Sequence, residues 1–207
     1  MSVQNNPIEV GTMVSSILYN RGNGYVLAVN QNGPCFDIVF VSGSYSRGLP
    51  ESILRGVQWT IYPRESGFAS AAQLDALSRN ADEVIAQAAR DEAAERAAFD
   101  CEVQALGCNP EYSKLVQGST GDGALAAKNI RILLKSAFPA TKFSVRKTDY
   151  GVLRVSWTGG PEREPVEAIT GRFKSGFYDV HSDYHDMAIT PWMKVFGHAE
   201  YIFTSRD

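Results

Sequence analysis

The stretch SAAQLDALSRNADEVIAQAARDEAAERAAFDCEVQALG, residues 70–107, decides how the chain is organised. It is rich in alanine and contains no proline, a composition typical of one long α-helix. Ser70 and Gln73 match a capping box at its start, and Gly107 with Pro110 matches a C-terminal stop. We therefore predict a helix over residues 71–106 that connects two other segments.

The ends of this predicted helix differ from its middle. Apolar residues recur at helical spacing only near the ends: Leu74, Leu77, Ala81, Val84 and Ala88, and then Phe99, Val103 and Leu106. The middle, AARDEAAERAA, offers only alanine and charge. We expect each end to pack on a neighbouring segment and the middle to face solvent. The helix is then a spacer, or its alanine faces form a homodimer through an antiparallel helix pair.

The segment before the helix, residues 1–64, is predicted to be all-β. Its short runs of β-branched and aromatic residues are separated by turn signals such as Asn23-Gly24 and Gly43-Ser44. About four or five short strands in a segment of this length favour a small, strongly bent β-barrel.

The segment after the helix, residues 111–207, is predicted to have the order α-β-β-α-β. Residues 124–139 are amphipathic, with Asp122 as the predicted N-cap. A hairpin around Asp149-Tyr150-Gly151, a helix in PVEAITGRF and a strand in HAEYIFTS follow. Alternation gives the hairpin one buried face, formed by Phe143, Val145, Leu153, Val155 and Trp157. The fold class is therefore α+β, with residues 65–110 as the connecting helix.

Composition points to an ordinary globular chain of 207 residues, with 44% hydrophobic content and a net charge of -3. Its three cysteines, Cys35, Cys101 and Cys108, show no C-x-x-C spacing, which argues against a disulfide framework and fits a reducing cytoplasm. The sequence has neither a secretion signal nor a long apolar run, so we expect no membrane contact.

Charge is distributed unevenly along the chain. Residues 65–102 hold three basic and nine acidic side chains, whereas residues 114–154 hold eight basic and two acidic ones. The basic block predicts a cationic binding surface for phosphates or for an acidic protein. Its candidate residues come from one helix and one hairpin: Lys128, Arg131, Lys135, Lys142, Arg146 and Arg154. We expect no exposed aromatic side chain among these cations. The alternative surface is the one around Tyr19, Arg21 and Tyr45.

The stretch FYDVHSDYHDM, residues 177–187, holds two of the three histidines of the chain. His181, His185 and Asp183 are a weak candidate set for a zinc or iron ion. The stretch lacks the glutamate of an H-E-x-x-H motif, so we interpret it as a structural or partner-binding segment and expect no metal and no other cofactor. There is also no G-x-S-x-G motif and no P-loop, so we expect the protein not to be an enzyme.

Several stretches resemble proteins of mobile genetic elements. YNRGNGYV, FDIVF and LPESILRGVQW resemble a small β domain of plasmid and conjugative-element proteins. KNIRILLKSAFPATKFSVRK, LRVSWTGGP and PVEAI resemble a large polyvalent protein-associated domain of phages and conjugative elements. The resemblance implies a protein that helps mobile DNA to establish itself in a new host, and it carries no catalytic residues over.

Three functions are consistent with these features. The leading hypothesis is a non-enzymatic protein that binds and inhibits a host defence protein or ribonucleoprotein complex, as anti-CRISPR and antirestriction proteins do. The alternative is a DNA-binding accessory protein for processing incoming mobile DNA, which would contact nucleic acid directly. The third is a metal-dependent nuclease.

Overall fold

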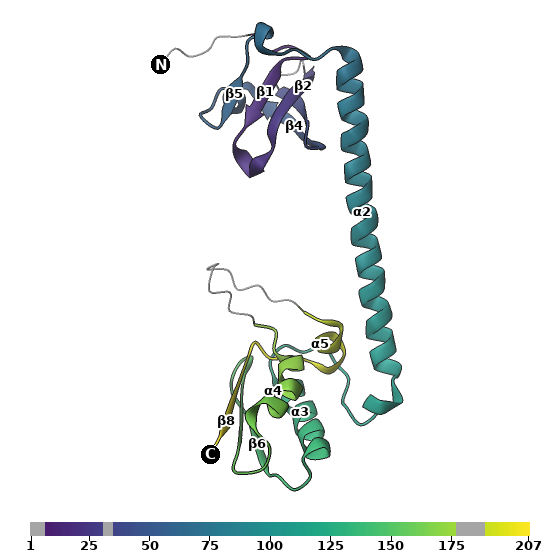
Figure 1. Ribbon diagram of the computed structural model, residues 1–207, viewed down its shortest axis with the longest axis vertical. Helices are drawn as coiled ribbons and strands as arrows, with labels where there is room; N and C mark the ends of the chain where they lie inside the picture. Colours follow the sequence, from purple (N-terminus) through teal and green to yellow (C-terminus); the bar gives the residue numbers. More distant parts are fainter. Residues whose placement is uncertain (1–6, 31–34, 177–188) are drawn as a thin grey trace. The chain divides into compact units, whose positions relative to one another are not determined.

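The computed structural model describes residues 7–30, 35–176 and 189–207 (Figure 1). The chain divides into two compact units, Met1–Ala94 and Glu95–Asp207. The division falls inside the long helix, which contributes one end to each unit.

The N-terminal unit is built on a five-stranded antiparallel sheet with the order β4-β3-β2-β1-β5. Its strands are β1 (Met13–Ser16), β2 (Gly22–Asn30), β3 (Cys35–Phe40), β4 (Ser44–Pro50) and β5 (Trp59–Ile61). The sheet is not closed, because the edge strands β4 and β5 do not pair with each other. The helix α1 (Glu51–Leu54) connects these two edges and contacts both. The predicted strands are therefore observed, but the helix α1 was not predicted and a barrel is not confirmed.

The two faces of this sheet have separate cores. Ile38 points into a cluster with Phe40 and Leu54, whereas its neighbour Val39 points to the opposite face. There Val39 packs against Leu74 and Ala81 of the long helix. Alternation along a strand thus lets one strand contribute to both cores.

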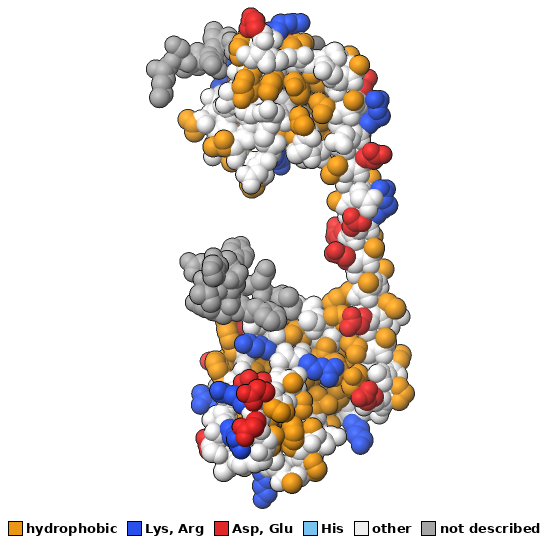
Figure 2. All heavy atoms as spheres, in the orientation of Figure 1, with side chains coloured by type: hydrophobic (Ala, Val, Ile, Leu, Met, Phe, Trp, Pro, Cys, Tyr) orange, Lys and Arg blue, Asp and Glu red, His pale blue; other side chains and the backbone are white. Residues whose placement is uncertain are grey.

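The long helix α2 spans Ala71–Cys108 and begins with the predicted capping box. The Ser70 amide donates a 2.8 Å hydrogen bond to Gln73 Oε1, and the Gln73 amide donates one of 3.4 Å to Ser70 Oγ. Residues 82–98 are exposed and carry interspersed acidic and basic side chains (Figure 2), so the prediction of a solvent-exposed middle is confirmed.

The helix α2 ends at Cys108, two residues beyond the predicted end at Leu106 and before Pro110 of the predicted stop. Gly107 remains helical, and Val103 and Leu106 pack against the core of the C-terminal unit. The chain leaves the helix at Asn109, which is extended with φ -72° and ψ 119°. The residue before a proline is forced out of the helical region, so Pro110 rather than Gly107 sets the end.

The C-terminal unit has a three-stranded sheet with the order β6-β7-β8. Its elements are α3 (Ala124–Ala137), β6 (Phe143–Asp149), β7 (Val152–Trp157), α4 (Arg163–Thr170), α5 (Pro191–Phe196) and β8 (Tyr201–Arg206). The predicted order α-β-β-α-β is present, with α5 as an additional helix before the last strand. Strands β6 and β7 form the predicted hairpin, and β8 pairs in parallel with β7.

The helices α3, α4 and α5 lie on one face of this sheet (Figure 1). We call this face the inner face and the opposite one the outer face. The inner face supplies Val145, Leu153, Val155 and Trp157 to the core, as predicted, together with Ile130 and Leu134 of α3. Ala137, the last residue of α3, is exposed.

A polar side chain is fully buried in this apolar core. Asn129 of α3 accepts a 2.8 Å hydrogen bond from the Val116 amide and donates bonds of 2.8 Å to the carbonyl oxygens of Val116 and Phe196. These three hydrogen bonds connect α3 to the segment before it and to the end of α5.

Candidate binding surface of the C-terminal unit

The outer face of the β6-β7-β8 sheet is built by alternation and strand register. In one row across the sheet, Arg146 of β6 is the partner of Arg154 of β7, and Arg154 is the partner of Phe203 of β8. In the next row, Ser144, Ser156 and Ser205 are partners in the same way. None of the described elements covers this face, and Arg146, Arg154 and Phe203 are all exposed.

The two arginines of this row have no counter-charge. Neither Arg146 nor Arg154 forms an ion pair or a side-chain hydrogen bond within the described part of the chain. Like charges directly opposite each other on neighbouring strands repel, which costs stability. An anion that approaches the outer face would relieve this repulsion.

An aromatic pair stands beside the arginines. Phe203 is 54% exposed, and its ring stacks on Tyr201 with a centroid distance of 6.4 Å and an interplanar angle of 11°. Both rings come from alternate positions of β8 and therefore share the outer face. The prediction that no exposed aromatic lies among the cations is wrong: the parallel pairing of β8 with β7 places Phe203 next to Arg154.

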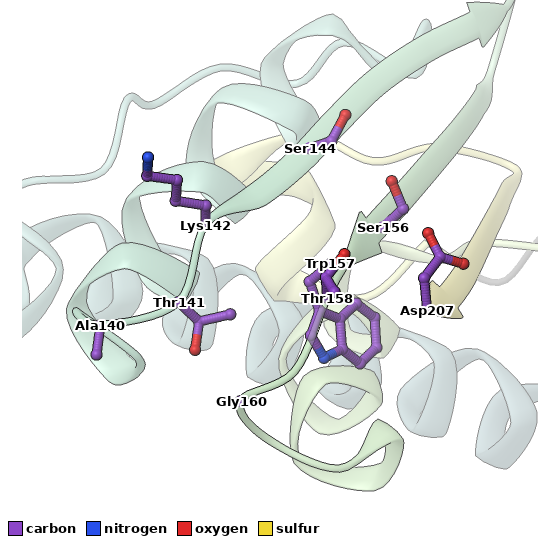
Figure 3. A pocket seen from close by; sticks show the side chains of 9 residues that line it. All are labelled: Ala140, Thr141, Lys142, Ser144, Ser156, Trp157, Thr158, Gly160 and Asp207. Atoms are coloured by element: carbon purple, nitrogen blue, oxygen red, sulfur yellow. The ribbon is translucent and has the colours of Figure 1, made fainter.

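A shallow pocket of about 720 Å³ adjoins the serine row (Figure 3). Lys142, Ser144, Ser156 and Asp207 direct their side chains to the outer side, whereas the Trp157 ring points toward the core. Lys142 supplies the positive charge of this pocket and Asp207 the negative one. The serine hydroxyl groups between them can each donate and accept a hydrogen bond.

The predicted cations on α3 lie on a different surface. Lys128, Arg131 and Lys135 are exposed, but α3 packs on the inner face of the sheet. Arg131 donates a hydrogen bond to the carbonyl oxygen of Val145 in the edge strand β6. The structure thus brings Lys142, Arg146 and Arg154 together, separates them from Lys128 and Lys135, and places Arg131 at the edge between the two groups.

One cation of the basic segment is neutralised locally. Lys147 Nζ lies 2.8 Å from Asp122 Oδ2, next to the start of α3. The hydrogen bond from Lys147 holds the pKa of Asp122 below its usual range, and a bond from the Ala124 amide adds to this. The N-cap residue of α3 is Gly123 and not Asp122 as predicted, and Asp122 accepts the bond from the Ala124 amide from one position earlier.

On the alternative surface around Tyr19, Arg21 and Tyr45, most side chains make contacts within the N-terminal unit. Arg21 lies over the Tyr19 and Phe40 rings and donates hydrogen bonds to Tyr45 O and Ser46 Oγ. The Tyr45 hydroxyl lies 2.9 Å from both Ser78 O and Asp82 Oδ1 of α2. Tyr19 is 86% exposed, whereas Arg21 and Tyr45 are half-buried.

The candidate metal ligands His181, His185 and Asp183 lie outside the described residues. Within the ranges that are described, no group of three or more His, Cys, Asp or Glu side chains could hold a metal ion. The third histidine, His198, is partly buried beside Gly121, and this burial lowers its pKa. Among the helices that the structure describes, none has the apolar length needed to cross a bilayer.

Comparison with known proteins assigns both halves of the chain. Residues 25–110 match large polyvalent protein associated domain 30, and residues 122–207 match large polyvalent protein associated domain 29. No curated protein and no solved structure matches the chain. These domains indicate an association with phages and other mobile elements. The chain therefore belongs to the proteins built from large polyvalent protein associated domains, with domain 30 followed by domain 29.

Proposed function

We propose that this mobile-element protein is a non-enzymatic inhibitor that binds a host defence complex of protein and nucleic acid and blocks it, as anti-CRISPR and antirestriction proteins do. The observation that carries the proposal is a set of exposed cations without acidic partners on the C-terminal unit: Lys128, Lys135, Lys142, Arg146 and Arg154. The proposed place of action is the cytoplasm of the bacterial host.

Electrostatics supports this proposal. Cations fixed on a helix and a hairpin keep a constant spacing, so they can match the phosphates or acidic side chains of a target. A concentrated positive field also speeds the encounter with such a target, and salt weakens it. A defence complex that holds guide RNA or DNA presents phosphates and protein surface side by side.

The proposal is tested by phage plating on bacteria that carry defined CRISPR or restriction systems. Expression of the protein should raise plating efficiency at least ten-fold in one such system, and the purified protein should co-elute with that complex after nuclease treatment. The variant Arg146→Ser/Arg154→Ser should lose this effect. The matched control Arg79→Ser/Arg90→Ser removes the same charge from α2 and should retain it. Unchanged plating in every system, or full protection by the first variant, would contradict the proposal.

A second candidate, the DNA-binding accessory protein, is favoured by one observation. Phe203 lies beside Arg154 and is exposed, and aromatic rings near cations are typical of surfaces that contact nucleic acid directly. The two candidates differ in partner. Complexes that disappear on nuclease treatment favour the accessory protein, and complexes that survive it favour the inhibitor.

A further inference from the structure

We infer that the outer face of the β6-β7-β8 sheet is a binding site for single-stranded nucleic acid, with a base stacked on Phe203 and phosphates held by Arg154 and Arg146. The inference rests on the proposed function, because it names the part of a nucleoprotein that this unit contacts.

The first step of the argument concerns the aromatic pair. A sheet face that is open to solvent normally carries polar side chains. Here β8 presents Phe203 on that face with 54% of its side chain exposed, and its ring stacks on that of Tyr201. No cation covers the Phe203 ring in the described chain, although Arg154 is its neighbour in the sheet. The exposed ring thus remains available to a planar ligand.

The second step concerns the kind of ligand. Bases present their faces only when a strand is unpaired, and stacking on aromatic side chains tolerates any base. Neighbouring strands lie about 4.8 Å apart, so the row from Phe203 to Arg146 is about 10 Å wide. A base on Phe203 therefore has both arginines within reach of its adjoining phosphates.

The third step concerns the surroundings of the row. The serine row, Ser144, Ser156 and Ser205, runs beside the arginines and offers hydroxyl groups to sugars and phosphates. Beyond it lies the pocket with Lys142 (Figure 3). Asp207 also lines this pocket, so a phosphate is favoured on its Lys142 side. Charge and hydrogen-bonding groups thus continue from the aromatic pair toward the end of the hairpin.

A duplex fits this site less well. Its bases are stacked inside, so it can use the arginines but not the Phe203 ring. We therefore expect a clear preference for single strands, which separates this site from a cationic surface that attracts any polyanion.

The test measures fluorescence anisotropy of labelled 12-mers of oligo(dT) and oligo(U) and of a mixed-sequence duplex, titrated with the 207-residue chain. Phe203→Thr should weaken single-strand binding about ten-fold or more, while Phe203→Trp retains it. Arg146→Ser/Arg154→Ser should reduce the slope of log K against log salt by about 1.4, as expected for two lost phosphate contacts. The control Arg79→Ser/Arg90→Ser removes the same charge from exposed positions of α2 and should change affinity less than two-fold.

Three outcomes overturn the inference: no binding of either 12-mer at low salt, equal binding of the duplex, or wild-type affinity of the folded Phe203→Thr protein. Circular dichroism shows whether each variant folds. A difference between the oligo(dT) and oligo(U) affinities identifies DNA or RNA as the preferred strand. This assay uses purified protein and naked strands, so its failure leaves phage plating unaffected, whereas a failed plating assay leaves strand binding intact.

Discussion

Replacing Asn129 by alanine should destabilise the C-terminal unit by about 3 kcal/mol. The fully buried side chain makes three hydrogen bonds of 2.8 Å, with the Val116 amide, the Val116 carbonyl and the Phe196 carbonyl. Each bond contributes about 1 kcal/mol net, and a buried group left without a partner costs about 1–3 kcal/mol. Alanine favours a helix more than asparagine does, which returns about 0.5 kcal/mol.

The measurement is urea unfolding followed by tryptophan fluorescence in a Trp59→Phe background. The two remaining tryptophans, Trp157 and Trp192, both belong to the core of the C-terminal unit, so they report on it alone. With a slope of about 1.5 kcal/mol/M, the midpoint should fall by about 2 M. The control Ser136→Ala removes an exposed hydroxyl group from the same helix and should shift stability by less than about 0.5 kcal/mol. A loss below about 1 kcal/mol for Asn129→Ala would refute the reasoning, because it would mean that the buried groups find other partners.

Three further expectations concern other parts of the chain. Tyr45→Phe removes the hydroxyl group that lies 2.9 Å from Ser78 O and Asp82 Oδ1, so it should cost about 1 kcal/mol and speed hydrogen exchange at the start of α2; unchanged exchange would contradict this. If the exposed middle of α2 is a spacer, light scattering at micromolar concentration should give the mass of one chain, and Ala93→Lys should leave it unchanged; a dimer that this variant disrupts would refute the spacer. Burial lowers the pKa of His198 below 6.5, so the unfolded state binds a proton more readily than the folded state. The free energy of unfolding should therefore fall as the pH drops below about 6.5, and this fall should be smaller in His198→Gln. The same pH profile in the variant and the wild type would contradict this expectation.

Local signals predicted the elements well. The capping box of α2 needs only Ser70 and Gln73, and the β6-β7 hairpin needs only a short turn and alternation on its two strands. Those same signals place Arg146 opposite Arg154, so the pairing of the two cations was accessible from sequence. Such features depend on residues a few positions apart.

Features that depend on distant pairing were not accessible. In HAEYIFTS both alternate sets carry apolar residues, so the sequence does not say whether Phe203 or Ile202 faces the core. The parallel register with β7 decides this, and it follows a crossover through α4 and α5. The open sheet of the N-terminal unit was also missed, because the helix α1, which lies between the edge strands β4 and β5, was not predicted. Asn129 was missed because a polar residue on an amphipathic helix gives no sign that it is buried.

The parallel pairing of β8 with β7 also sets an order of events during folding. The β6-β7 hairpin closes over a short turn, whereas residues 158–200 separate the two parallel strands, so β8 joins after a slower search. A chain in which β8 has not yet docked has Arg146 and Arg154 in its hairpin but lacks the ring of Phe203. If the outer face binds single strands as inferred, such a chain would attract any polyanion without selecting an unpaired strand. Selectivity would then arise only when the last strand docks, which makes it a property of the completed fold.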